Sequence, residues 1–150
     1  MAAVKNIWTT EGSGVWINLE GHGKTDAEIT AQIPDVTHVS PLGTGREVKK
    51  KGTVSGAEYS AGGKQTYTDP EVKFLLNDKT MATYNQLLDA IDDATKLDMS
   101  LKVTYPWGET VYGDVVLVDM ARPEATESHE IVEITAKFAI SGRLKRIVKK

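Results

Sequence analysis

The order of elements in the second half of the chain restricts its fold more than any other feature of the sequence. Residues 69–147 read as a strand, a helix, a hairpin and a long strand in unbroken succession. Their sequences are EVKFLL, NDKTMATYNQLLDAIDDATKL, SLKVTYPWGETVYGDVVLVDM and HEIVEITAKFAI. Strand segments arranged around a single helix predict an α+β domain that is mainly β.

The helix is the clearest of these elements. Apolar side chains at helical spacing predict its buried face, and they are Met81, Tyr84, Leu87, Leu88, Ile91 and Ala94. Polar side chains on the other side are Asn85, Asp89, Asp92 and Asp93. Asp78 or Thr80 is expected to cap the helix by accepting a hydrogen bond from an amide of the first turn.

The segments after the helix show a period of two. Leu101, Val103 and Tyr105 alternate with polar residues, and residues 106–109 predict the turn of a hairpin. The consecutive apolar residues 115–118 predict a strand that is covered on both faces. In the last strand, alternation places apolar side chains on one face, namely Val132, Ile134, Ala136, Phe138 and Ile140.

The first third of the chain is also β-like. Residues 15–19 are rich in strand-forming side chains and lie between glycines, which predicts a strand. Residues 27–33 alternate between apolar and polar, which predicts a half-buried strand that ends at Pro34.

Residues 43–68 are polar, rich in glycine and poor in apolar anchors. They predict a long loop with a weak hairpin around residues 48–59. A loop of this length in a compact domain is generally either functional or disordered. Two interpretations stay open: a flexible surface insertion, or an arm that becomes ordered against a neighbouring subunit.

The composition fits one domain spanning residues 1–150. The chain has no cysteine, which excludes disulfides and cysteine-based metal sites and fits a reducing cytosol. No apolar run approaches the roughly 20 residues of a membrane-spanning helix, and no secretory signal is expected. The formal net charge is −3, with basic runs at residues 49–51 and in an expected C-terminal tail, residues 143–150.

No motif in the sequence meets the requirements of a reaction site. Gly23-Lys24-Thr25 resembles the end of a phosphate-binding loop, but Asn18 stands where that motif requires glycine. The three histidines are far apart and lack a metal-ligand spacing, and no GxSxG nucleophile motif occurs. We therefore expect no enzyme activity, no catalytic or metal-binding residues and no cofactor.

Scattered aromatic residues offer an alternative. Trp8, Trp16, Trp107 and Tyr112 are of the kinds that stack on sugars or single-stranded nucleic acid. Their scatter favours core packing or subunit contact. A stand-alone sugar- or nucleic-acid-binding β-domain is kept as the alternative to a structural protein that works through its surfaces.

The second half of the chain resembles the major tail tube protein of long-tailed bacteriophages, especially lambda-like siphoviruses. The resemblance lies in a strand that ends in a short turn (71–77), the helix around YNQLLDA, the hairpin KVTYPWGETVYG and the final strand 129–140 with SGR after it. It covers about half of the chain and is only general over the N-terminal part. It implies a tail-tube fold: an antiparallel β-sandwich or barrel-like domain flanked by one helix, with a long loop.

The resemblance also implies a function. Members of this family form rings of six copies that stack into a hollow tube, which conducts DNA from capsid to host. Such a subunit is made in the host bacterial cytoplasm and resides in the virion tail. The implied partners are further copies of the chain, a tape-measure protein, a tail terminator and baseplate or tip proteins. The loop 43–68 corresponds to the segment that reaches the adjacent ring, with candidate residues Arg46, Lys49, Lys50, Lys51 and Tyr59.

Electrostatics adds a prediction about the channel. A wall that lets DNA slide is acidic or neutral, because it must not bind phosphate. The acidic residues available for it are Asp114, Asp119, Glu130 and Glu133. Residues 49–51 are therefore expected outside the channel or paired with acids of the next ring. The alternatives on a similar fold are a tail terminator, a baseplate ring or a tube protein of a secretion or bacteriocin system.

Overall fold

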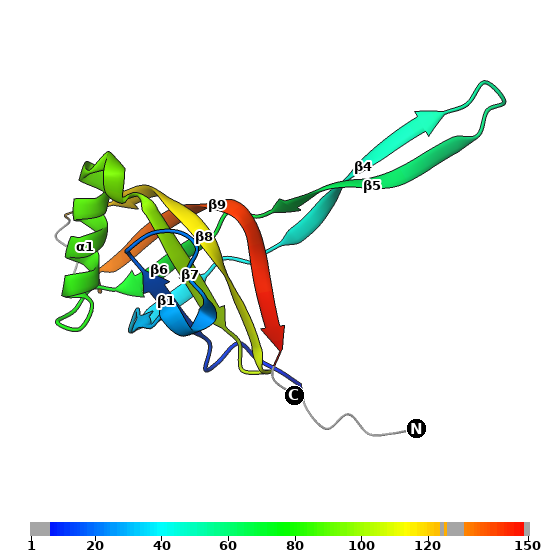
Figure 1. The fold of residues 1–150 in the computed structure, drawn as a ribbon. Coiled ribbons are helices and arrows are strands. Elements are labelled where there is room, and N and C mark those ends of the chain that lie inside the picture. The colour runs from blue at the N-terminus through cyan, green and yellow to red at the C-terminus, as the bar shows by residue number, and fades with distance from the viewer. Residues whose placement is uncertain (1–6, 124, 126–130, 149–150) are drawn as a thin grey trace.

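One antiparallel sheet of seven strands curls on itself into a half-barrel (Figure 1). The structure is a computed structural model that describes residues 7–123, 125 and 131–148. The strand order is β2-β1-β7-β8-β9-β6-β3. The strands are β1 (Gly14–Asn18), β2 (Ala31–Gln32), β3 (Val36–Val39), β6 (Glu71–Leu75), β7 (Asp98–Thr104), β8 (Glu109–Ala121) and β9 (Glu133–Val148). The predicted α+β, mainly β class is confirmed in its barrel-like form.

The longest pairing of the sheet joins β8 and β9, from Glu109 opposite Val148 to Ala121 opposite Thr135. β8 also pairs with β7 through the predicted hairpin turn. Its first hydrogen bond runs from the Tyr105 amide to the Glu109 carbonyl at 2.8 Å. Gly108 in this turn has φ +89°, a left-handed conformation that glycine adopts without steric cost.

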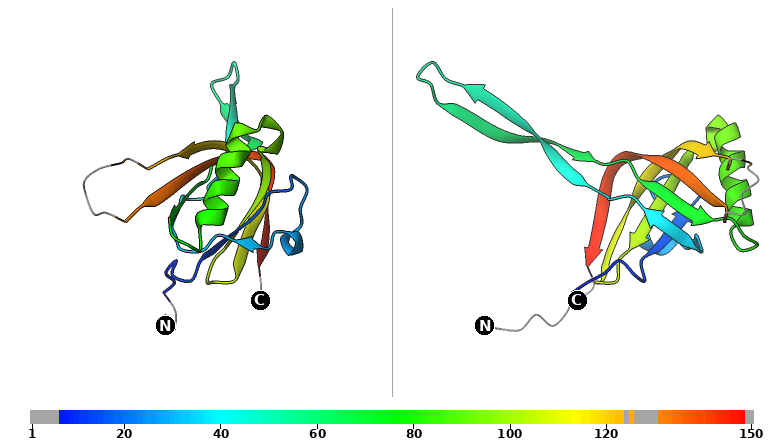
Figure 2. Two further views of the ribbon diagram at one scale, coloured as in Figure 1. Left: turned by 90° about the vertical axis from the view of Figure 1, so that its left-hand side faces the viewer. Right: turned by 180° about the vertical axis from the view of Figure 1, so that it is seen from behind.

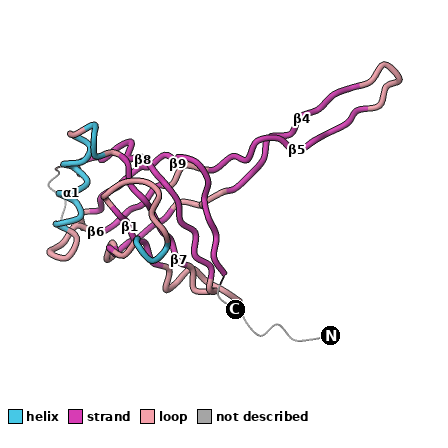
Figure 3. Tube along the Cα trace, viewed as in Figure 1, coloured by secondary structure: helices cyan, strands magenta, loops and turns pink. Residues whose placement is uncertain are grey.

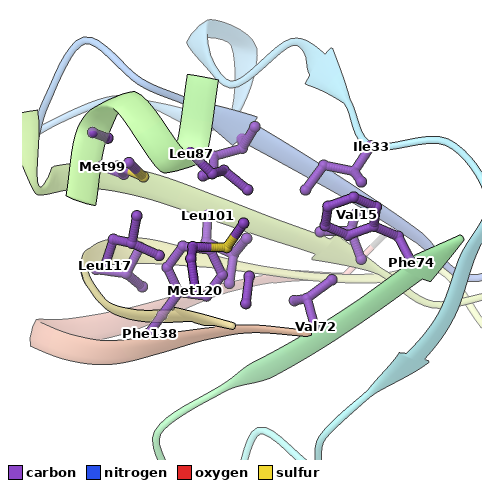
Figure 4. Packing of buried hydrophobic residues seen from close by; sticks show 14 of the residues in the cluster. Val15, Ile33, Val72, Phe74, Leu87, Met99, Leu101, Leu117, Met120 and Phe138 are labelled. Carbon is purple, nitrogen blue, oxygen red and sulfur yellow. The ribbon is translucent and has the colours of Figure 1, made fainter. Parts of the chain in front are cut away.

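The concave side of the half-barrel holds the hydrophobic core (Figure 4). Alternate strand residues point into it, including Val15, Phe74, Leu101, Leu117 and Phe138. Helix α1 (Met81–Asp92) packs at one end of the half-barrel and adds Leu87 and Ala90 to the same cluster. Burial of one large apolar side chain contributes about 1.5–3 kcal/mol, so this cluster is the main source of stability.

The start of α1 differs from the prediction, since neither Asp78 nor Thr80 caps the helix with its side chain. The Asn77 carboxamide oxygen accepts instead from the amides of Lys79 and Thr80, at 2.9 and 3.2 Å. The Thr80 hydroxyl is fully buried and donates to the Leu75 carbonyl at 2.6 Å. Thr80 therefore ties the helix back to β6, which takes its hydroxyl away from the helix amides.

The buried face of α1 is centred on Leu87 and Ala90. Tyr84, Leu88 and Ile91 pack against the core from its sides, as predicted. Met81 is 42% exposed, and Ala94 is exposed in the short 3-10 helix η2 (Ala94–Lys96), so the ends of the predicted stripe were wrong. Within the described residues, no helix is both long and apolar enough to cross a membrane.

Two apolar positions of the long strands also depart from prediction. Val115 and Leu117 are buried, but Val118 is 58% exposed. A register shift between Leu117 and Asp119 turns two successive residues outward, so residues 115–118 are not covered on both faces. In β9, Ile134, Ala136 and Phe138 point into the core as predicted, whereas Val132 precedes the strand and is exposed.

The half-barrel lacks the strand predicted at residues 27–33. Residues 26–28 form the 3-10 helix η1 (Asp26–Glu28), and β2 contains two residues. The cause is local: the Glu28 carboxylate accepts from the Thr25 amide at 3.2 Å and from its hydroxyl at 3.0 Å. Ile29 and Ile33 are buried as the alternation requires, but Ala27 and Ala31 are exposed.

A two-stranded arm projects from the half-barrel on the side away from α1 (Figures 1 and 2). It consists of β4 (Thr44–Gly52) and β5 (Glu58–Tyr67), with a tip closed by the Thr53 amide donating to the Ala57 carbonyl at 2.8 Å. The expected long loop is therefore a regular hairpin over nearly all its length (Figure 3). The weak hairpin predicted at residues 48–59 is its outer part.

The basic C-terminal segment is not a tail as far as Val148. Residues 143–148 continue β9 and pair with the first residues of β8, with Arg146 opposite Val111 and Lys145 opposite Tyr112. A register shift near Gly142, which has φ +86°, bends the strand at this point. Pairing with β8 therefore makes residues 143–148 a strand, although their basic character had predicted a tail.

Candidate assembly surfaces

The arm has two chemically different faces. In an antiparallel pair, directly opposite residues project from the same side. Lys49 lies opposite Ala61, and Lys51 lies opposite Tyr59, so these four residues form one side, called here the lysine face. The reverse face carries Val48, Lys50, Ser60 and Glu58.

All five residues predicted for inter-subunit contact lie on the arm and are exposed: Arg46, Lys49, Lys50, Lys51 and Tyr59. The register divides them, because Lys50 points away from Lys49 and Lys51. Arg46 donates to the Gly63 carbonyl at 3.2 Å and so braces the arm at its register shift. The arm thus offers two lysines and a tyrosine on one side for contact with another molecule.

Charge is segregated between the arm and the rest of the chain. Residues 44–67 contain five basic and two acidic side chains, a formal charge of +3. Because the whole chain carries −3, the remainder carries −6. The arm therefore carries charge opposite in sign to that of the rest of the chain, and attraction between such charges acts over about 8 Å at physiological salt.

A cavity of about 480 Å³ lies between the edge strand β3 and the side of the sheet formed by β1 and β7. β3 forms one edge, where Val36 and Val39 line the cavity, and the other side includes Val15 and Tyr105. Edge strands leave backbone amides and carbonyls open to pairing with another chain. These edges can accept a strand from a neighbouring subunit, which would satisfy them.

A second cavity of about 400 Å³ separates the base of the arm from the ends of β8 and β9. Leu42 and Tyr67 line it from the arm side, and Val111 and Leu144 line it from the sheet. Nearby, the Arg146 guanidinium donates to the Glu109 carboxylate. The arm therefore leaves the half-barrel over a partly open junction.

The three predicted channel acids that the structure describes do not form one cluster on the subunit. Asp114 accepts a hydrogen bond from the Gly23 amide at 2.9 Å, so it serves the subunit's own structure. Asp119 is exposed opposite Lys137, and Glu133 accepts from the Thr37 hydroxyl at 2.5 Å. Glu130 lies outside the described residues.

The segment that resembled a phosphate-binding loop forms a strap over the outer side of the sheet. His22 lies 2.9 Å from the Val115 carbonyl, and the Ser100 hydroxyl donates to the Gly21 carbonyl at 2.9 Å. Lys24 is paired with Glu20 at 3.4 Å. The Gly23 amide donates to the Asp114 carboxylate, so this amide is already used within the chain.

Aromatic and basic side chains alternate in a row across four strands on the outer side of the sheet. Trp16 lies opposite Lys102, Lys102 opposite Tyr112, and Tyr112 opposite Lys145. The Lys102 ammonium is 5.3 Å from the centre of the Trp16 ring, and that of Lys145 is 5.8 Å from the centre of the Tyr112 ring. Lys102 also pairs with the Asp26 carboxylate at 3.1 Å.

The structure therefore brings together two of the four aromatic candidates. Trp107 instead stacks on Tyr105 at the β7–β8 turn, with centroids 4.8 Å apart, and Trp8 is exposed. The role of Lys102 was not predicted. Its signal was present in the sequence, since Lys102 is one of the two polar residues of the alternating run 101–105 and lies on the side away from the core.

Ionisation in the described residues is perturbed at a few positions. Burial raises the pKa of the Tyr105 phenol, and the nearby Glu109 carboxylate raises it further. Hydrogen bonds from Thr25 lower the pKa of Glu28, and those from Thr95 lower that of Asp93. No group of three or more acidic or histidine side chains suited to a metal ion occurs in the described part of the chain.

No protein-family model matches the sequence, and no curated protein matches it. Solved structures match it in fold. One is a chain of the PVC sheath/tube terminator, from an extracellular contractile injection system in the extended state, with TM-score 0.70 and 14% identity over 97% of this chain and 100% of that one. A chain of the PVC sheath-tube complex gives TM-score 0.69 and 14% identity over 97% and 95%.

A third similar structure is the baseplate of the anti-feeding prophage, with TM-score 0.71 and 8% identity over 97% of this chain and 98% of that one. At these identities the similarity establishes the fold. The matching structures come from a contractile injection system and from the anti-feeding prophage, so they do not single out the tail tube protein of lambda-like phages. The chain has the fold found in sheath-tube, terminator and baseplate structures of such particles.

Proposed function

We propose that the protein is a structural subunit of a tail-type tube, with six copies per ring and rings stacked into a hollow conduit for DNA. The observation that carries the proposal is the fold match over nearly the whole of both chains. The subunit resides in the tail of the particle and catalyses no reaction. Its partners are further copies of itself, a tape-measure protein, a terminator and baseplate or tip proteins.

The described surfaces suit such an assembly. A ring of identical subunits closes through contacts between two different patches of the same chain. The half-barrel offers two different edges, β2 and β3, for lateral contact. The arm carries charge opposite to that of the half-barrel and projects beyond it, which suits contact between rings.

The channel wall is proposed to be acidic or neutral. Asp119 and Glu133 are exposed on neighbouring strands and are our candidates for it among the described residues. Asp114 is a weaker candidate because it is less exposed than these two residues and its carboxylate accepts from the Gly23 amide. Repulsion between carboxylates and phosphates would let DNA slide without being bound.

A second candidate function is a terminator or baseplate ring, or a tube protein of a secretion or bacteriocin system. It is favoured by the similarity to chains of a terminator and of a baseplate structure. The two candidates differ in one property. A tube subunit stacks without a limit set by the subunit itself, whereas a terminator stops at one ring.

Negative-stain electron microscopy of the purified protein over a concentration series tests the proposal. Hollow tubes or stacked rings of uniform width are expected, with lengths that grow with concentration. Single rings at every concentration would favour the terminator or baseplate candidate. Monomers that bind a sugar or single-stranded DNA would overturn both structural candidates.

A further inference from the structure

We infer that the lysine face of the arm docks on the acidic side of α1 in a second copy of the chain. This inference rests on the proposed function and names the two surfaces that would meet when rings stack. The lysine face of one copy binds the acidic side of α1 in the next copy. The contact joins two different surfaces, so it is heterologous and repeats from ring to ring.

The arm contributes little to the structure of its own subunit. β4 and β5 pair with each other in a sheet separate from the half-barrel. Lys49, Lys51 and Tyr59 are exposed, and within the described residues neither lysine forms an ion pair. An ordered hairpin with lysines that have no partner on the same chain is suited to an acidic surface elsewhere.

The acidic side of α1 supplies such a surface. Asn85, Asp89 and Asp92 lie on one side of the helix and are exposed. α1 itself carries two acidic side chains and no basic one, a formal charge of −2, which is opposite in sign to the +3 of the arm. Asp93 and Asp98 are engaged with Lys96 and His22, whereas Asp89 and Asp92 form no ion pair within the described residues.

The spacing of the two sets of charges also agrees. Lys49 and Lys51 are two residues apart on one strand face, which separates them by about 6.8 Å. Asp89 and Asp92 are three residues apart on a helix, which brings their Cβ atoms to about 5–6 Å. Each lysine therefore reaches one carboxylate when a strand of the arm lies along the helix.

The positions of the two surfaces permit stacking. α1 lies at one end of the half-barrel and the arm projects from the other, in all views that show both along the long dimension of the molecule (Figures 1 and 2). A subunit therefore presents its arm in one direction and its helix in the opposite one. Repetition of this contact extends an assembly in one dimension.

Nucleic acid is the competing partner for the lysine face, since lysines neutralise phosphates. A second copy is favoured because the body of the same chain carries the matching charge at −6. A DNA conduit would also be obstructed by lysines that bind its cargo. The two partners predict different effects of the variants below.

Charge reversal tests the contact. Lys49→Glu/Lys51→Glu and Asp89→Lys/Asp92→Lys place like charges together, and each is expected to lower the fraction of protein in stacked assemblies about tenfold or more. The chain carrying all four substitutions restores the attraction with its sign inverted, and stacking is expected to return. The single variants Lys50→Glu and Lys51→Glu are the matched control. Both make the same change in charge at adjacent positions, but the two residues lie on opposite faces of the arm, so only Lys51→Glu should weaken stacking.

Cross-linking tests the same contact without changing charges. The chain has no cysteine, so Ala61→Cys and Asn85→Cys can be made on separate preparations with different tags and mixed with a short bismaleimide. A cross-linked pair of the two tags is expected, and Ser60→Cys on the reverse face should give much less of it. The cross-link tests the contact whether or not the unmodified chain forms tubes. An absence of tubes would count only against the proposed function.

Other outcomes overturn the inference. Tubes from the unmodified chain together with undiminished stacking of both charge-reversed variants would leave the proposed function intact and remove this contact. So would a chain with all four substitutions that stays as defective as the two parents. If Lys49→Glu/Lys51→Glu abolishes binding of DNA fragments and leaves stacking unchanged, the lysine face binds nucleic acid instead.

Discussion

Lys102 holds its ammonium group 3.1 Å from the Asp26 carboxylate, which joins β7 to the strap over the outer side of the sheet. The same group lies 5.3 Å from the centre of the Trp16 ring, and the Lys102 side chain is only 14% exposed. One cation therefore connects three segments of the N-terminal and central chain. A charge shielded in this way is stabilised more by its partners than an exposed one.

Lys102→Met keeps the apolar stem of this side chain and removes the charge. We expect the free energy of unfolding to fall by about 1–2 kcal/mol, measured by chemical denaturation. Lys24→Met is the matched variant, since Lys24 pairs with Glu20, whose side chain is 80% exposed. Equal losses for the two variants would contradict a special role for Lys102.

Leu87 anchors α1 to the core and is fully buried. Leu87→Ala should reduce the free energy of unfolding by about 2–5 kcal/mol, because it opens a cavity between the helix and the sheet. Met81→Ala in the same helix, where the side chain is 42% exposed, should cost much less. Thermal and denaturant unfolding of both variants measure the difference.

Asn77, not Asp78 or Thr80, supplies the side-chain acceptor at the start of α1. Its amide group also donates to Asp35 at 2.7 Å. Asn77→Ala is expected to lower the free energy of unfolding by about 1–2 kcal/mol. Asp78→Ala serves as the neighbouring control, and a larger loss there would restore the original prediction of the cap.

Because the pKa of Tyr105 is raised, the free energy of unfolding should fall as the pH rises in the alkaline range. Its neutral phenol is favoured by the fold, so the contribution is complete below the ordinary pKa of 10.0 and is lost as pH rises through the higher folded value. Tyr105→Phe retains the stack on Trp107 and should flatten this fall. Unfolding at a series of pH values between neutral and strongly alkaline measures it, and identical slopes for both proteins would refute it.

The arm is predicted to be dispensable for folding. Gly45 lies opposite Thr66, so residues 46–65 can be replaced by an Asn-Gly turn that joins the two strand ends. The free energy of unfolding should change by no more than about 0.5 kcal/mol, since the arm contributes no residue to the core cluster. Stacked assemblies should be lost. A large loss of stability would show that the arm packs on its own half-barrel.

Local signals in the sequence predicted the elements that local interactions specify. The turn at residues 106–109 and the apolar spacing of α1 gave the correct hairpin and helix because both depend on near neighbours. The arm was predicted only as a loop with a weak hairpin, because its strands lack such a local signal. Both of its faces are exposed, so no alternation of apolar and polar residues marks its strands.

Features that depend on distant contacts were not predictable. One local competition was also missed, because the Thr25–Glu28 hydrogen bonds replaced a strand that alternation had indicated. The pairing of residues 143–148 with β8 converted an expected tail into part of the sheet. The five residues predicted for inter-subunit contact lie on the hairpin, and their division between two faces follows from a register that spacing alone does not fix.

The long antiparallel pairing of β8 with β9 has a mechanical consequence. A force that pulls along these strands loads their inter-strand hydrogen bonds in shear, so the bonds resist together and do not open one after another. β9 runs for 16 residues from the α1 end of the half-barrel to the opposite end. The subunit should therefore be stiff along this direction, and the register shifts beside Gly113 and Val118 mark where it would yield first.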